Sequence, residues 1–269
     1  RLELTGPIRG AAITAPAVAL LGQLAFTLLG ILPFVLSVSP ELHTTFGKFG
    51  IGAPLVFALI AVLVLIMPAQ RTAPDGSAAL APRTWLSFVR RRWTLPLGLA
   101  LLFIVLSTVL AGRASAPDDD GNHTMYWVDA GALQVGTGIY GWYYSIPHLA
   151  IIALLLAVTA FGLRWISRPP LSADSERDAA ARRQRSLVLI ALVTGALLLH
   201  LGGIWHDLAG TAGVRGHGST EDGDLRTWSD FAALEQPLRI AARIVNIAGY
   251  TTWVTTLLLL ALPRKRSTR

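Results

Sequence analysis

The chain has 269 residues, of which 53% are hydrophobic and only 14% are charged, with a net charge of +7 and no cysteine. A soluble domain of this size carries roughly 25% charged residues. Here the uncharged residues gather in long runs, which is typical of a polytopic membrane protein. The lack of cysteine excludes disulfides, thiolate metal sites and cysteine nucleophiles. The basic residues flank the apolar runs, so they favour membrane topology over nucleic-acid binding.

Six apolar runs predict an all-α bundle of six transmembrane helices that forms one domain over residues 1–269. Each run is close to or above the ~20 residues that cross a hydrocarbon core of ~30 Å. The outer connections, 113–138 and 210–238, are rich in Gly, Asp and Ser, and we expect them to fold back over the helix ends. The polar stretch 172–186 is expected to extend the fifth span as a solvated helix. The predicted spans are 11–38, 51–69, 93–112, 140–166, 186–209 and 240–262. Because the chain starts at Arg1 rather than Met, we expect a further segment before it.

Positive charge is distributed unevenly among the segments that connect these spans. The segments before span one, between two and three, between four and five, and after span six hold 17 of the 23 lysines and arginines. The other segments hold six, together with eleven of the 16 acidic residues. The positive-inside rule therefore predicts cytoplasmic termini and acidic outer segments. Tryptophans at the predicted inner ends (Trp93, Trp165) and outer ends (Trp142, Trp205) favour the same boundaries. Trp253 falls in mid-span, where we expect it to pack against neighbouring helices.

Two histidines, His148 and His200, lie inside the fourth and fifth spans. If these spans are antiparallel, both lie about eight residues, roughly 12 Å, below the same outer surface. Ionisable residues inside a span are costly and are candidates for function. The pair can ligate one heme b or a metal between two helices, or each histidine can hydrogen-bond a neighbouring helix or line a small polar cavity. His206 is six residues beyond His200 and so faces another direction.

Further polar and aromatic residues near the outer ends suggest a cavity that opens outward. Pro147 precedes His148 and can free a backbone carbonyl, which is tolerated at membrane depth where the backbone lines a cavity. Arg243, followed by Asn246, can bind an anionic group or reach toward the interface. The candidate cavity residues are Trp142, Tyr144, His148, His200, His206, Arg243 and Asn246.

The basic segment 83–92 places Trp85, Leu86 and Val89 on one helical face, with Phe88 beside them. This pattern indicates a short amphipathic helix at the membrane interface or one that docks on a cytoplasmic partner. Trp85, Phe88 and Val89 are the candidate contact residues.

Common catalytic motifs are absent from the chain. It has no Walker A motif, no HExxH zinc motif and no GxSxG elbow. No predicted span carries Asp or Glu in its middle, which argues against a carboxylate-based ion relay. We therefore do not expect an enzyme.

Three functions remain open for a protein of the plasma membrane, whose composition suits a bacterium. The first is a permease or transport-associated subunit driven by a separate cytoplasmic ATPase, a layout that resembles six-span ABC exporter permeases without any motif of that family. The second is an electron-transfer protein with one heme b between His148 and His200. The third is a non-catalytic accessory or sensor subunit. The partners expected are membrane lipids and other membrane or ATPase subunits, and not nucleic acid.

Overall fold

A computed structural model describes residues 4, 6–35, 50–67, 91–130, 133–167, 175–220 and 223–262. These residues are predominantly helical, and five helices are long and apolar enough to cross a membrane. The sixth apolar helix has 14 residues, about 21 Å, which is shorter than a hydrocarbon core. The predicted helical architecture with helices able to span a membrane is therefore confirmed, whereas the count of six spans stays a prediction. The helices are α1 (Gly6–Val35), α3 (Ala53–Ile66), α4 (Arg91–Ala114), α5 (Trp142–Ile166), α6 (Ser175–Ala212) and α7 (Glu235–Ala261).

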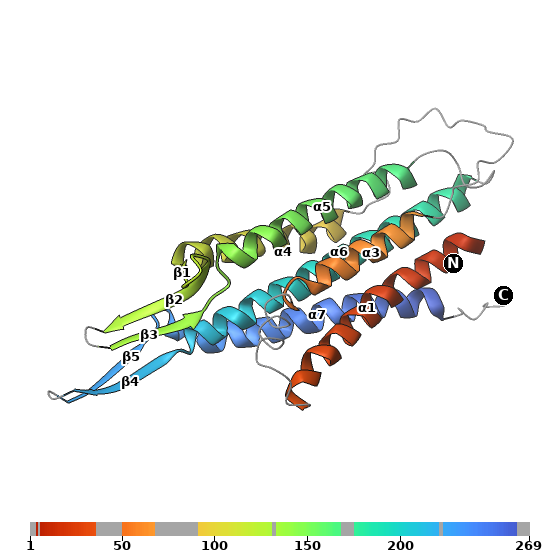
Figure 1. Ribbon diagram of the computed structural model, residues 1–269. Coiled ribbons are helices and arrows are strands. Elements are labelled where there is room, and N and C mark those ends of the chain that lie inside the picture. The colour runs from red at the N-terminus through yellow and green to blue at the C-terminus, as the bar shows by residue number, and fades with distance from the viewer. Residues whose placement is uncertain are drawn as a thin grey trace.

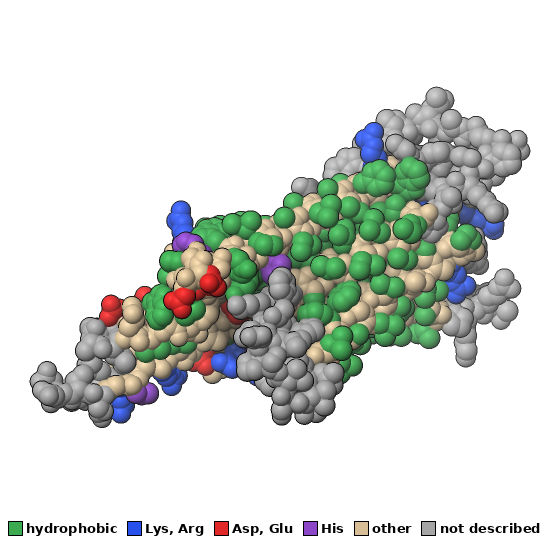
Figure 2. All heavy atoms as spheres, in the orientation of Figure 1, with side chains coloured by type: hydrophobic (Ala, Val, Ile, Leu, Met, Phe, Trp, Pro, Cys, Tyr) green, Lys and Arg blue, Asp and Glu red, His purple; other side chains and the backbone are tan. Residues whose placement is uncertain are grey.

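The helices lie lengthwise beside one another, and α1 begins at the end of the bundle where α7 finishes (Figure 1). Helix α6 packs against α1, α3, α4, α5 and α7. In its most apolar stretch 83% of the residues are buried, against 17–33% in the other four long helices. On the face shown in Figure 2, hydrophobic side chains cover the middle of the bundle, as a lipid-facing surface requires. Helix α6 is thus the central helix.

Trp253 of α7 packs closely against the central helix α6. Its side chain is fully buried and donates from Nε1 to the Leu192 carbonyl at 2.9 Å. It fits because Gly195 of α6 has no side chain; a Cβ there would lie 2.4 Å from Trp253 Nε1. The expectation that Trp253 packs against neighbouring helices is confirmed.

The predicted extension of the fifth span is helical, since α6 begins at Ser175. The polar side chains of this extension are not all exposed to solvent, however, because Asp178, Arg182 and Arg185 are buried. These side chains lie against the C-terminal ends of α3 and α5, a contact that local polarity cannot reveal. The amphipathic segment with Trp85, Phe88 and Val89 lies outside the described residues.

The connections 113–138 and 210–238, which we expected to fold back over the helix ends, contain two β-hairpins, and this corrects the all-α expectation. They extend away from the bundle at the end opposite to the start of α1 (Figure 1). In the first hairpin, Thr124, Tyr126 and Val128 alternate as buried residues along one strand, the period of two of a half-buried strand. The antiparallel strands are β1 (Ala116–Pro117), β2 (His123–Ala130) and β3 (Leu133–Gly138) in one sheet, and β4 (Arg215–Thr220) and β5 (Gly223–Trp228) in the other. A short 3₁₀ turn, η1 (Ala232–Leu234), leads into α7.

The two hairpins contact each other and form one unit, which we call the hairpin module (β1–β5). The Tyr126 ring packs edge-on against Phe231 at 5.3 Å between centroids, and its hydroxyl donates to Asp230 Oδ2 at 3.2 Å. Thr211 donates from its hydroxyl to the Gly138 carbonyl, and Ser229 to the Ala212 carbonyl. These bonds tie both hairpins to the end of α6.

Candidate functional site

The two predicted histidines meet in the bundle beside a third ring, Tyr140, which precedes α5. The His148 and His200 rings lie edge to face with centroids 5.1 Å apart. The Tyr140 hydroxyl is 3.0 Å from His148 Nδ1 and 3.5 Å from His200 Nε2. The exposed fractions are 5%, 0% and 1% for His148, His200 and Tyr140. We call these three residues the His–Tyr cluster.

One arrangement of protons uses every contact in this cluster. His200 Nδ1 lies 2.6 Å from the Ile51 carbonyl, which can only accept, so Nδ1 carries a proton and Nε2 of the neutral ring accepts. Tyr140 then donates to His200 Nε2, and its oxygen accepts from His148 Nδ1. The cluster is therefore a chain of neutral groups with all three donors used.

Neighbouring segments leave room for these rings. Gly52 precedes α3, and a Cβ there would lie 2.4 Å from His148 Nε2. Its backbone, with φ −86°, is open to any residue, so the requirement for glycine is one of space. Asp207 of α6 accepts a hydrogen bond from the Tyr140 backbone amide, which positions the segment before α5. Tyr140 was not predicted as a site residue, and no local motif marks it.

Helix α6 binds both ends of the short helix α3. His200 bonds to the carbonyl of Ile51, just before α3, and Arg185 Nη2 donates to the carbonyl of Leu65, near its last residue, at 3.2 Å. The two carbonyls are 14 residues apart and the two side chains 15, or about 21 and 22 Å along their helices. This match lets α6 hold a helix that is too short to cross the bilayer alone.

The arginine end of α6 forms a second polar cluster, Asp178, Arg182 and Arg185. Arg182 Nε donates to Asp178 Oδ2 at 2.8 Å, and its Nη1 donates to the Ile166 carbonyl at the end of α5. The last carbonyls of a helix have no partner within the helix and carry partial negative charge, so guanidinium groups stabilise them. Arg182 and Arg185 thus bind the C-terminal ends of α5 and α3.

The geometry of the His–Tyr cluster does not fit a heme. Bis-histidine ligation needs an iron between two imidazole nitrogens that face it from opposite sides. Here His148 Nδ1 and His200 Nε2 both face the Tyr140 oxygen. The phenol occupies the place an iron would take, and the rings touch edge to face with no space for a macrocycle. Among the described residues no group of three or more His, Cys, Asp or Glu side chains is placed to hold a metal. Heme binding stays a prediction that this geometry does not support.

The other predicted cavity residues have neighbours other than the histidines in the contacts described. Trp142 packs on Gly112 of α4, and Tyr144 lies edge-on against Tyr143. Asn246 packs on Gly202 of α6. His206 and Arg243 are exposed. Because the histidines are buried, they do not line an open vestibule.

A surface site that the sequence analysis did not identify lies on the hairpin module. Arg215 and His217 on β4 pair across the strands with Trp228 and Arg226 on β5. These four residues, the Trp228 face, share the exposed side of the hairpin, whereas the intervening Gly216 and Thr227 are buried. They line a shallow pocket of about 420 Å³ with Thr227 and Ala232. The alternation of basic and small residues in β4 could have predicted a strand with a basic face.

Comparison with known proteins finds no match: no protein family, curated protein or solved structure resembles this chain.

Proposed function

We propose that this chain is a non-catalytic accessory subunit of a membrane assembly, whose helical bundle anchors the hairpin module for binding a partner outside the membrane. The observation that carries the proposal is the Trp228 face. Trp228 is 62% exposed at a hairpin surface that also presents Arg215 and Arg226. Tryptophan and arginine are the residues that most often dominate binding energy in protein interfaces.

The construction of the module also supports this role. Tyr126 and Asp230 join the two hairpins, and Thr211 and Ser229 join them to the end of α6. A surface held in this way loses little conformational entropy when it binds. The His–Tyr cluster, in contrast, is closed and uses its donors internally, which suits a structural part.

Transport driven by a separate ATPase remains a prediction. Its expected docking residues in 83–90 lie outside the described part of the chain. No feature of the described helices favours transport over the accessory role.

Footprinting with hydroxyl radicals tests the proposal, because the module carries its own control. Trp228 and Trp127 are both exposed, at 62% and 44%, and lie on different hairpins. We expect Trp228 to be labelled several-fold less in native membranes than in the purified protein, and Trp127 to change little. Equal labelling of Trp228 in both preparations would contradict a partner at this face.

A pair of substitutions sharpens the test. Trp228→Ala should weaken the assembly by about 2 kcal/mol, roughly 30-fold in affinity, if Trp228 is an interface anchor. Trp127→Ala is the matched control and should leave the assembly unchanged. Both are measured as the fraction of the protein that migrates as a larger complex after mild solubilisation.

A further inference from the structure

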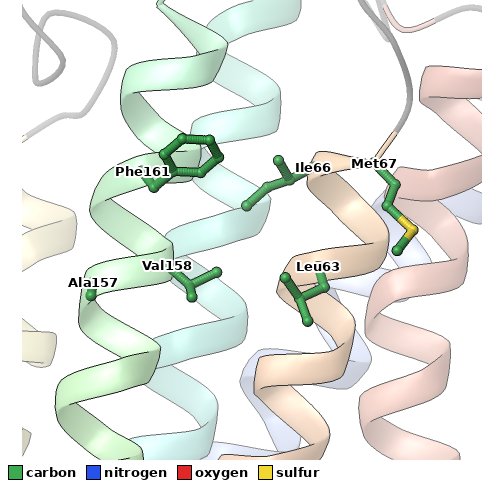
Figure 3. A pocket seen from close by; sticks show the side chains of 6 residues that line it. All are labelled: Leu63, Ile66, Met67, Ala157, Val158 and Phe161. Atoms are coloured by element: carbon green, nitrogen blue, oxygen red, sulfur yellow. The ribbon is translucent and has the colours of Figure 1, made fainter.

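A groove between α3 and α5 differs in chemistry from the pocket at the Trp228 face. The groove measures about 360 Å³, and Figure 3 shows only apolar side chains around it, such as Leu63 and Phe161. This lining matches the lipid-facing surface of the bundle and offers no charge that could select a partner. The lining of the pocket at the Trp228 face, in contrast, includes Arg215 and Arg226.

The strand register places two arginines beside one indole. Arg215 on β4 is directly opposite Trp228 on β5, and Arg226 lies two residues before Trp228 on the same strand. Because side chains alternate along a strand, all three lie on one face. The two arginines are diagonal neighbours across the hairpin, a relation that separates Cβ atoms by about 7 Å. A short segment that packs on the indole can therefore reach both guanidinium groups.

The charge of these arginines is only partly neutralised by the described residues. Glu235 Oε2 lies 3.6 Å from Arg215 Nη2, but the same carboxylate accepts a hydrogen bond from Arg239 at 2.8 Å. The Arg215 side chain stays 69% exposed. Arg226 is also exposed and forms no ion pair with a described acidic residue. The face therefore presents donors that a carboxylate can accept.

We propose that the partner at the Trp228 face is an acidic protein segment, whose carboxylates bind Arg215 and Arg226 while an apolar side chain packs on the indole. This inference rests on the proposed function and names the chemistry of its partner. The planar guanidinium groups match carboxylates in geometry and charge. The hairpins extend away from the bundle (Figure 1), so the face meets its partner outside the hydrocarbon region.

Fluorine NMR of the full chain in detergent, labelled with fluorotryptophan, tests this assignment. The probes are hexaglutamate and, with the opposite charge, hexalysine, at low salt, where exposed charges are least screened. We expect hexaglutamate to shift the Trp228 resonance until it saturates and to leave Trp127, on the other hairpin, unmoved. The readout is local, so peptide bound to basic segments elsewhere does not affect it. The variants Trp228→Phe and Trp127→Phe assign the two resonances. A Trp228 resonance that hexaglutamate leaves unmoved, or that hexalysine shifts equally, would overturn the proposal.

A charge reversal at Arg226 locates the site. Arg226→Glu replaces attraction by repulsion and should weaken the binding of hexaglutamate about tenfold. Arg113→Glu makes the same change in net charge at an exposed position of α4 and should have little effect. Thermal unfolding checks that both variants fold. An equal loss of binding in the two variants would show that net charge alone attracts the peptide and would refute the site.

The footprint of Trp228 in native membranes separates this inference from the proposed function. If Trp228 is protected there but hexaglutamate does not bind, the accessory role stands and the acidic partner is overturned. If hexaglutamate binds but Trp228 is not protected, the preference of the face for carboxylates is supported and the accessory role fails.

Discussion

The two ends of α3 are bound to α6 by different chemistry. At the end near the hairpin module, the neutral imidazole of His200 bonds to Ile51 within a cluster of neutral groups. At the opposite end, the guanidinium of Arg185 bonds to Leu65 beside the Arg182–Asp178 pair. His148 lies six residues inside α5, about 9 Å from its start, whereas Arg182 lies level with the last residues of α5.

This difference follows from the cost of charge in a bilayer. Deep in the hydrocarbon region a polar group must be satisfied internally and is best kept neutral. Near a helix C-terminus, free carbonyls and the nearby interface reduce the cost of a cation. The comparison therefore predicts that substitutions at the arginine end act through charge and those at the histidine end through hydrogen bonds and space.

The largest effect is expected for Arg182→Met at the arginine end. It leaves the buried Asp178 carboxylate without its guanidinium, which should lower the free energy of unfolding by about 4 kcal/mol. Chemical unfolding in detergent, followed by tryptophan fluorescence, measures the loss. Arg183→Met, at the exposed neighbouring position, should change stability by less than about 0.5 kcal/mol. If Asp178→Asn in the Arg182→Met background recovers nothing, the loss does not arise from charge.

At the histidine end, His200→Ala should cost about 3 kcal/mol. The variant removes the bonds to Ile51 and Tyr140 and leaves a cavity in a fully buried position. Hydrogen exchange should rise first in the opening turn of α3, since that turn loses its tie to α6. His217→Ala on the exposed hairpin face is the control. Exchange that rises uniformly over all helices would show that His200 does not anchor α3 in particular.

The smallest effect is a steric one at Gly52. Gly52→Ala should cost about 2 kcal/mol, because the new Cβ displaces the His148 ring. Gly98→Ala in α4, where a Cβ meets no atom within 4 Å, should instead stabilise by up to about 1 kcal/mol through helix propensity. Thermal unfolding of both variants is the measurement. The Gly52→Ala cost should shrink in a His148→Ala background; an equal cost in both backgrounds would place the clash elsewhere.

The pattern of apolar and polar residues along the sequence predicted the helices well and the hairpins poorly. The predicted spans 93–112 and 140–166 correspond closely to α4 and α5, because a run of apolar residues long enough to cross a bilayer leaves few alternatives. Strand β2 gives no comparable signal, because its apolar residues Met125 to Val128 are consecutive and do not alternate with polar residues.

The site was predicted in part, for a related reason. The sequence by itself determined that His148 and His200 are ionisable residues inside apolar runs at similar depth. Only the tertiary structure decided that Tyr140 lies between them and that Arg185 meets the end of α3. These contacts depend on how neighbouring helices are rotated and shifted along one another. That register is set by packing between residues far apart in the chain, such as Gly52 against His148. The periodicity of a single apolar run therefore does not predict it.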